Sequence, residues 1–350
     1  MKIKNLLVAL GVTLGSLTTA FHAQAAEPEY TFKLHHFLPP MAMAHKKILQ
    51  PWADKVMKES GGRIKIDVFP AMQLGGKPPQ LLDQVRKGVV DISWTVGGYT
   101  PGRFPKASVF ELPFMAASAE ATSMALQEYG EEEMQDELSD VHVLALHTHA
   151  PGSLHSRGEL LKTSADVKGL KLRAPNKAMA EAFDIMGAAP VFMPVTQMSS
   201  ALSKGILDVA ALPFEVVVPM KINQLTNNHT LVSGDRGLYT QFFVFSMNKK
   251  TYAKLPAELK KVIDNNAGIE LSRHIGSLFD QSEQAGYDIT AAGGNHFYTL
   301  PASEAAHWKK QMQPVTDAWI NDMTDDGLNG QALYNKANAL ITKYQQQTGS

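Results

Sequence analysis

The residue best placed to do chemistry in this chain is Arg173. It ends a short alternating segment, Leu170-Lys171-Leu172-Arg173, and Ala174-Pro175 follows it. This pattern predicts a strand whose carboxyl end carries a guanidinium group, and doubly wound domains bind ligands at that end of the sheet. A guanidinium pairs with a carboxylate through two parallel hydrogen bonds. We therefore expect Arg173 to hold a carboxylate ligand; the alternative is an ordinary surface arginine, the most common fate of this residue type.

Histidines gather after two apolar segments. His35 and His36 end the first, and His147, His149 and His155 follow the second. Such a cluster could bind a metal ion. No Asp or Glu lies within the second group, which favours histidines that hydrogen-bond locally, one of them facing a cleft and donating to an anion. We expect no metal site and no cofactor.

The motifs of common enzymes are not assembled in this sequence. There is no Gly-rich phosphate loop, no Gly-x-Ser-x-Gly elbow and no His-Glu-x-x-His pair. Ser246 and Lys249 match Ser-x-x-Lys, but the supporting Ser-Asp-Asn and Lys-Thr-Gly elements are missing. An exported enzyme such as a hydrolase is the alternative of another class; without a nucleophile, base and orienting group, we expect no enzyme.

Composition sets wider bounds on the function. The chain has 350 residues, 44% apolar and 19% charged, which suits about two domains with large cores and excludes general disorder. A formal net charge of -1 provides no basic surface for nucleic acid. The absence of cysteine excludes disulfides, thiolate metal sites and a cysteine nucleophile.

The first 25 residues have the pattern of a secretory signal. Lys2 and Lys4 precede an apolar stretch over residues 6–17, and Ala23-Gln24-Ala25 fits the small-x-small cleavage rule. A membrane anchor, the alternative, needs about 20 apolar residues. Cleavage after Ala25 leaves 31 basic and 34 acidic residues, a net charge of -3. We expect an exported, mildly acidic protein that is free in the periplasm and not inserted in the membrane.

Alternating strand and helix patterns follow the signal. Strands are predicted over residues 31–36, 63–69 and 89–96, and helices over residues 48–57 and 80–87. This order favours a parallel, doubly wound sheet. Near the C-terminus, apolar residues at helical spacing predict a helix that Pro314 should kink. The polar tail, residues 345–350, is predicted to fray.

One unit of the pattern occurs twice. Lys87-Gly88-Val89-Val90-Asp91-Ile92 follows a strand and a helix, and so does Lys204-Gly205-Ile206-Leu207-Asp208-Val209. A gap this large indicates two similar α/β domains with a cleft between them, although such units also recur by chance. Each second strand ends near bulky or polar residues that a cleft would use: Trp94 and Tyr99 in the first copy, Phe214 and Glu215 in the second.

Together these residues resemble the solute-binding proteins of tripartite ATP-independent periplasmic (TRAP) transporters, of the dicarboxylate-binding type. The resemblance covers nearly all of the mature chain, and the order and spacing of its motifs carry it. Besides the two Lys-Gly units, the motifs are Ser60-Gly61-Gly62-Arg63-Ile64-Lys65-Ile66, Phe69-Pro70-Ala71-Met72-Gln73-Leu74-Gly75-Gly76, Glu111-Leu112-Pro113-Phe114 and Val167-Lys168-Gly169-Leu170-Lys171-Leu172-Arg173-Ala174-Pro175.

The resemblance implies an α/β, two-domain periplasmic-binding-protein (Venus-flytrap) fold. Each domain is a mixed, mostly parallel sheet flanked by helices, and a long helical region ends the chain. The expected division is residues 26–150 plus about 238–280 for domain I and residues 151–237 plus about 281–350 for domain II. The resemblance also implies closure around a carboxylate held by Arg173, and delivery to the membrane permease subunits of a TRAP transporter. A monomer is the default.

Two departures from the family pattern narrow the ligand. Gly152 stands at about the place where members that bind sugar acids often carry a second arginine. Val209-Ala210-Ala211-Leu212-Pro213-Phe214 replaces a frequent Gly-Gln-Glu-Asn-Pro, so that Phe214 takes the place of polar groups. One arginine with several aromatics favours a monocarboxylate with an apolar or aromatic body, or a small 2-oxo or 2-hydroxy acid. The alternative within the family is a C4-dicarboxylate or sugar-acid ligand.

The expected ligand-binding residues come from both domains and from the segments between them. Besides Arg173, they are Phe214, Glu215, Trp94, Tyr99, His36, Phe37, Gln73, His149 and Phe242. Phe214 and Trp94 could equally belong to the core. A sensor input domain or the binding protein of an ATP-driven importer would have a similar composition, and only the family resemblance separates the TRAP interpretation from these.

Overall fold

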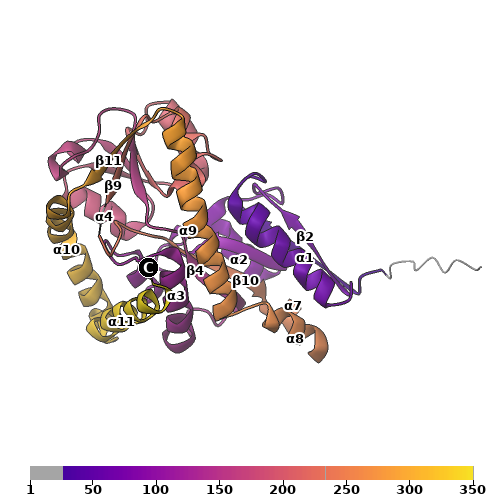
Figure 1. Ribbon diagram of the computed structural model, residues 1–350. Helices are drawn as coiled ribbons and strands as arrows, with labels where there is room; N and C mark the ends of the chain where they lie inside the picture. Colours follow the sequence, from indigo (N-terminus) through magenta and orange to yellow (C-terminus); the bar gives the residue numbers. More distant parts are fainter. Residues whose placement is uncertain (1–26, 233, 350) are drawn as a thin grey trace, which may run out of the picture.

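The computed structural model describes residues 27–232 and 234–349. The expected signal peptide, residues 1–25, lies outside the described residues. The described chain forms two lobes, each built on one β-sheet (Figure 1). No helix in these ranges has both the length and the apolar character needed to cross a bilayer.

The first lobe contains a five-stranded mixed sheet. Three neighbouring strands at one side of the sheet are parallel, and the fourth strand pairs antiparallel with both of its neighbours. In spatial order the strands are β2 (Ile64–Phe69), β1 (Tyr30–His36), β3 (Ile92–Val96), β10 (Phe242–Asn248) and β4 (Val141–Thr148).

The second lobe contains a six-stranded mixed sheet, in which three of the five neighbouring pairs are parallel. Its strands, in spatial order, are β11 (His296–Leu300), β9 (Asn228–Val232), β5 (Ser153–Ser156), β8 (Val209–Leu212), β6 (Lys171–Ala174) and β7 (Ala189–Phe192).

The repeat in the sequence is a repeat of structure. In each sheet a strand lies between two parallel partners: β1 between β2 and β3, and β6 between β7 and β8. The repeated aspartate does the same in both lobes. Asp91 accepts a hydrogen bond from Lys33 N and Asp208 accepts one from Lys171 N, each at 2.9 Å. The carboxyl ends of β1 and β6 therefore occupy equivalent positions in the two lobes.

Helices cover both sheets and connect them. The first lobe carries α1 (Gln50–Glu59), α2 (Leu81–Lys87), α3 (Ala119–Glu133), α7 (Lys249–Ala253) and α8 (Ala257–Asn265), and the second carries α4 (Lys177–Ile185), α5 (Met198–Ser203) and α6 (Phe214–Val217). Three long helices end the chain: α9 (Ile269–Ala292), α10 (Ala302–Asp325) and α11 (Gly330–Thr348). Pro314 lies inside α10, as the sequence predicted.

Two sequence predictions were wrong in detail. Strand β3 begins at Ile92, not at residue 89, because Gly88 ends α2 in a left-handed conformation and the chain needs three residues to turn back. The C-terminal tail is not frayed through residues 345–349. Helix α11 continues to Thr348, and Gln345 donates a hydrogen bond to Asp235 O at 3.0 Å, which ties the last turns to the body.

Helix α9 spans both lobes, and Figure 1 shows it in orange along the whole molecule. Its 24 residues extend over about 36 Å at 1.5 Å per residue. Glycine lets it approach each lobe closely: a Cβ at Gly276 would stand 2.5 Å from Ala119 O in α3, and one at Gly286 would stand 2.2 Å from Phe214 O in α6. The helix is therefore seated on α3 in one lobe and on α6 in the other.

The chain crosses between the lobes several times. It passes from β4 to β5, returns from β9 to β10, and crosses again along α9. We propose domain boundaries near residues 150, 238 and 281 at these crossings. In this division α11 belongs to the second domain, yet it packs on α3 of the first lobe and so also joins the two (Figure 1).

Candidate functional site

A small cavity lies where the two lobes meet. Its polar wall consists of Tyr99, His149, Arg173, Glu215 and Gln241, and its apolar wall includes Phe37, Val96 and Phe243. About 30 Å³ of it is open to the centre of a water-sized sphere, which is room for roughly two water molecules. The lobes thus meet tightly here, so a ligand must part them to enter.

Arg173 is held rigidly beside this cavity. It lies in β6 with 1% of its surface exposed. Its Nε donates to Met193 O at 3.1 Å and its Nη1 to Ala211 O at 2.7 Å, while its Nη2 has no partner among the described residues. No described carboxylate forms an ion pair with it. A buried guanidinium without a counter-charge is costly, so the side chain is preset to receive an anion.

Tyr99 forms a hydrogen bond between the two lobes. The residue lies in the turn after β3, and its hydroxyl accepts a hydrogen bond from Val195 N of the second lobe at 3.0 Å. Burial raises the pKa of Tyr99, and the Arg173 charge opposes that shift. The hydroxyl stays protonated, and because it accepts from Val195, its own proton remains available to a ligand oxygen.

Tyr239 explains the missing second arginine. A Cβ at Gly152 would stand 2.3 Å from the Tyr239 ring, so no side chain fits at Gly152 while Tyr239 is present. Tyr239 is fully buried, and its hydroxyl has no partner among the described residues. Burial raises its pKa, and the charge of nearby Arg173 opposes this shift. An aromatic ring therefore fills the space that the resemblance assigned to a second cation.

His149 lines the cavity but offers no donor to an anion. Its Nδ1 lies 2.5 Å from Ala150 O, so we assign the proton to Nδ1, and its Nε2 accepts from Gln241 N at 3.2 Å. Burial lowers the pKa of His149 to about 4, which keeps the ring neutral. His149 therefore positions Gln241, whose amide also donates to Pro175 O at 2.8 Å.

Besides Arg173, Tyr99 and His149, Glu215 is the only titratable residue among the described residues that line the cavity. It is 6% exposed, and its Oε2 has no partner among the described residues. Burial, together with the neighbouring Glu283, raises its pKa well above the ordinary value, which favours the neutral form of the carboxyl. Glu283, in α9, accepts hydrogen bonds from the backbone N–H groups of Phe214 and Glu215 at 2.8 and 3.0 Å, which fixes the start of α6.

The structure brings together five of the ten residues expected from the sequence: Arg173, Glu215, Tyr99, Phe37 and His149. The other five lie elsewhere. Trp94 is one layer behind the wall, stacked on Phe37 and Phe243 with centroid distances of 5.1 and 4.6 Å. Its indole N–H donates to His147 at 2.8 Å, so its polar group is satisfied in the core.

The remaining four have local partners or face away. Phe214 packs within the second lobe, edge-on to His155 at 4.8 Å. His36 bonds His45 at 3.0 Å, and Gln73 is exposed in the loop after β2. Phe242 lies between Gln241 and Phe243, which line the cavity, and its own side chain lines a different pocket. Sequence reasoning missed Gln241, Phe243 and Tyr239, which lie on the segment that returns to the first lobe.

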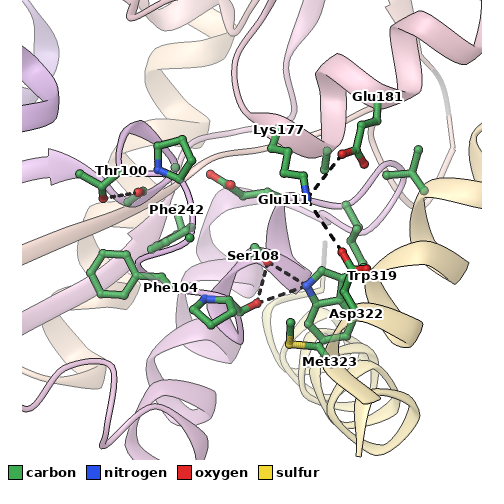
Figure 2. A pocket seen from close by; sticks show the side chains of 18 of the residues that line it. Thr100, Phe104, Ser108, Glu111, Lys177, Glu181, Phe242, Trp319, Asp322 and Met323 are labelled. Carbon is green, nitrogen blue, oxygen red and sulfur yellow. Dashed lines mark hydrogen bonds and ion pairs between the residues drawn. The ribbon is translucent and has the colours of Figure 1, made fainter. Parts of the chain in front are cut away.

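That different pocket is the larger of the two. It lies between the turn after β3, the start of α4 and helix α10, with about 400 Å³ open to a water-sized sphere (Figure 2). Buried Glu111 lines it, and burial raises the pKa of that carboxyl to about 8. Lys177 at its rim pairs with Glu181 and Asp322 at 3.6 and 3.9 Å. Because its one cation is exposed and already paired, this pocket suits an organic anion less well than the smaller cavity.

Metal binding has no support in the described part of the chain, which contains no group of three or more His, Asp or Glu side chains that could hold an ion. The histidines that suggested a metal have hydrogen-bond partners within the protein, and His35, for example, pairs with Gln84 Oε1 at 2.7 Å. His155 Nδ1 lies 2.7 Å from His229 Nδ1, and its Nε2 lies 2.9 Å from Leu212 O. Burial lowers the pKa of His155 to about 3, so it is neutral.

Comparison with known proteins places this geometry in context. Residues 34–322 match the model of a family described as bacterial extracellular solute-binding protein, family 7. A curated relative, the outer membrane transporter protein TsaT of Comamonas testosteroni, is 27% identical over 304 residues, which cover 86% of this chain and 88% of the relative.

Two solved structures are closely similar over almost the whole chain. One is a marine metagenome TRAP solute-binding protein specific for aromatic acid ligands, in complex with 3-hydroxybenzoate. It is 47% identical with a TM-score of 0.89, over 91% of this chain and 99% of that one. The other, from Rhodoferax ferrireducens T118, contains copurified benzoate; it is 45% identical with a TM-score of 0.89, over the same shares of each chain.

Proposed function

The chain belongs to family 7 of the bacterial extracellular solute-binding proteins and is a TRAP solute-binding protein, and from this premise we propose that its ligand is an aromatic monocarboxylate held by Arg173. The observation that carries the proposal is the buried guanidinium, which has one nitrogen without a partner and is the only cation among the described residues that line the cavity. A ligand carboxylate would pair with Nη2 and with the free hydrogen of Nη1.

The charge balance favours a single carboxylate. Among the described residues that line the cavity, Arg173 is the only cation, and the raised pKa of Glu215 favours its neutral form. A second ligand carboxylate would be buried without a counter-ion, which costs several kcal/mol in a closed site. Tyr239 against Gly152 leaves no room for another arginine that could pair with it.

The shape of the wall favours a flat ligand. The rings of Phe37, Trp94 and Phe243 are nearly parallel, with interplanar angles of 17° and 20° between neighbours. A planar ring in the cavity can pack against such a layered wall in an offset geometry. The two solved structures at 47% and 45% identity, which contain 3-hydroxybenzoate and benzoate, support the same ligand class.

Closure follows from contacts that both lobes make. The ligand carboxylate meets Arg173 on the second lobe, and Tyr99 of the first lobe closes over it and bonds Val195. Closing removes water and strengthens the ion pair. The closed form then presents both lobes to the membrane permease subunits. We propose a periplasmic monomer, released from its signal after Ala25, that delivers its ligand unchanged and catalyses no reaction.

Titration calorimetry on the mature protein tests the ligand. We expect tight binding of benzoate-like acids, and weak binding of succinate and malate. Arg173→Ala should abolish tight binding while the fold persists, and Arg173→Lys should also bind poorly because an ammonium cannot form the paired bonds. Arg157→Ala, which removes an exposed arginine of the same lobe, is the matched control. Tight binding of succinate or malate without binding of benzoate-like acids would refute the proposal.

A further inference from the structure

Glu215 sits in the binding cavity in an unusual state for an acidic residue. It belongs to the first turn of α6, its backbone N–H is fixed by Glu283, and its Oε2 is buried with no partner among the described residues. Leaving a buried polar atom unsatisfied is destabilising, and nothing else in the second lobe requires this carboxyl. An atom of this kind in a ligand cavity is a position prepared for a ligand group.

We propose that Glu215 reads a hydroxyl group on the ligand and so makes the protein select hydroxylated aromatic monocarboxylates over their unsubstituted or alkyl-substituted counterparts. The inference rests on the proposed function, because it assumes an aromatic acid anchored at Arg173. It adds a protein contact for the end of the ligand opposite the carboxylate, which the proposed function does not specify.

Geometry separates the two polar groups. Arg173 and Glu215 line the same cavity, and no ion pair joins them among the described residues. Arg173 lies in β6, and Glu215 follows β8, the neighbouring strand. A ring held against the aromatic wall therefore has its carboxylate at one strand end and a substituent at the other.

The protonation state of Glu215 suits a hydroxyl. Glu283 of α9 disfavours the charge of Glu215. The other titratable groups among the described residues that line the cavity are Arg173, to which Glu215 is not paired, Tyr99 and the neutral His149. A neutral carboxyl can donate one hydrogen bond and accept others, as a phenol can, so the two satisfy each other. A methyl group in the same place fills the volume and leaves Oε2 unsatisfied. Sites built to hydrogen-bond a hydroxyl discriminate strongly against analogues that lack it.

The test compares ligands matched in size. Calorimetry measures the dissociation constants of benzoate, of 2-, 3- and 4-hydroxybenzoate, and of the three methylbenzoates at pH 6.5. We expect at least one hydroxybenzoate to bind about tenfold or more tightly than the methylbenzoate with the same substitution pattern, the ratio that one net buried hydrogen bond supplies.

Variants then assign the preference to Glu215. Glu215→Leu should reduce the hydroxyl-to-methyl ratio to about one, and Glu215→Gln, which is neutral and keeps a donor and an acceptor, should retain most of it. The unliganded Glu215→Leu protein should melt at the wild-type temperature or above it, since it loses an unsatisfied buried group. Glu111→Gln, a buried carboxyl in the other pocket, is the matched control and should leave the ratio unchanged.

The outcomes separate the two proposals. If no aromatic acid binds, the proposed function fails and the inference fails with it. If benzoate binds but no hydroxybenzoate is preferred over its methyl counterpart, the function stands and the role of Glu215 is refuted. A preference that survives Glu215→Leu likewise overturns the assignment, whereas a preference lost in Glu215→Leu and kept in Glu215→Gln supports it.

Discussion

His35 and Arg173 occupy equivalent places in the two lobes and differ in whether their side chains are satisfied. His35 pairs with Ser93 across β1 and β3, as Arg173 pairs with Ala210 across β6 and β8. The His35 ring is fully bonded: Nδ1 lies 2.7 Å from Gln84 Oε1, and Nε2 accepts from Leu74 N at 3.3 Å. Arg173 keeps one nitrogen without a partner among the described residues.

The same arrangement of strands thus carries two different side chains. In the first lobe the strand-end residue, His35, has its hydrogen bonds satisfied, and burial lowers its pKa, which favours the neutral ring. Where the strand-end residue is left unsatisfied, as at Arg173, we propose that the lobe receives the anion. We expect the ligand to contact the second lobe first and the first lobe to close afterwards. Variants that change one lobe at a time can test this difference.

Replacing each of the two strand-end residues separately should give the largest difference in ligand affinity. Arg173→Ala is expected to weaken aromatic-acid binding by about 2–5 kcal/mol, or roughly 30-fold to several thousand-fold, because it removes a buried charge partner. His35→Gln should change affinity less than about threefold. Calorimetry on both variants checks this, and a comparable loss in His35→Gln would contradict the asymmetry.

Binding should weaken as pH rises because of the acid in the second lobe. The pKa of Glu215 is raised, so the residue is neutral at low pH and gains charge as pH rises through its folded pKa. A charged Glu215 repels the anionic ligand, and burial together with the neighbouring Glu283 opposes its ionisation. We expect affinity to be highest at low pH and to fall as pH rises through the folded pKa of Glu215.

Glu215→Gln should remove most of that decline, and His35→Gln in the first lobe should not affect it. Calorimetry between pH 5.5 and 9.5 measures the profile. An identical decline in Glu215→Gln would show that another group is responsible.

Two acidic residues of α9, Asp280 and Glu283, should differ in their effect on ligand affinity but not in their effect on the free energy of unfolding. Asp280 accepts from Ala119 N and Glu120 N in the first lobe at 2.7 and 2.9 Å, as Glu283 accepts from the start of α6 in the second. Losing such a capping acceptor costs about 0.5–2 kcal/mol. Urea unfolding should therefore show similar losses for Asp280→Asn and Glu283→Gln, but calorimetry should show weaker binding only for Glu283→Gln, which holds Glu215.

Tyr99→Phe should test the bond that joins the lobes. The variant loses the hydroxyl that accepts from Val195 N, at a cost of about 0.5–1.5 kcal/mol to the closed form. We expect affinity to fall about threefold to tenfold, with the unfolding free energy of the unliganded protein little changed. Small-angle scattering should show that the liganded variant closes less fully. Unchanged affinity would mean that this bond does not contribute to closure.

The repeated aspartates should give the smallest and most equal effects. Asp91 and Asp208 each accept one backbone hydrogen bond at 2.9 Å, from Lys33 N of β1 and from Lys171 N of β6. We expect Asp91→Ala and Asp208→Ala to lower the unfolding free energy by about 1 kcal/mol each, without changing affinity. A clear difference between them in urea unfolding would show that the two copies are not energetically equivalent.

Sequence reasoning found much of the frame because local signals carry it. The repeated order of strand, helix and Gly turn was visible in the sequence, and Arg173 stood at a strand end that faces the cavity between the lobes. Only half of the expected site residues line the cavity, because neighbouring side chains along the chain point to opposite sides. Phe214 and Glu215 are adjacent, and only packing against α9 and His155 decides that the ring enters the core and the acid faces the cavity.

The missed residues have a different physical cause. Gln241 and Phe243 reach the cavity because β10 returns to the first sheet after about a hundred residues in the second lobe, and their spacing from Arg173 shows no local pattern. His149 was found, but its neutral, fully used ring depends on Ala150 and Gln241 together. Such tertiary hydrogen bonding cannot be inferred from a single sequence.

The contact between Gly152 and Tyr239 limits how this protein can evolve. A mutation that placed arginine at Gly152 would drive its Cβ into the Tyr239 ring at 2.3 Å, so it would be harmful alone. A mutation that first shrank Tyr239 would open a cavity beside Arg173, at a cost of a few kcal/mol. A shift toward doubly charged substrates therefore requires two changes, each deleterious without the other. The ring next to the glycine thus acts as an evolutionary barrier that favours retention of the present ligand class.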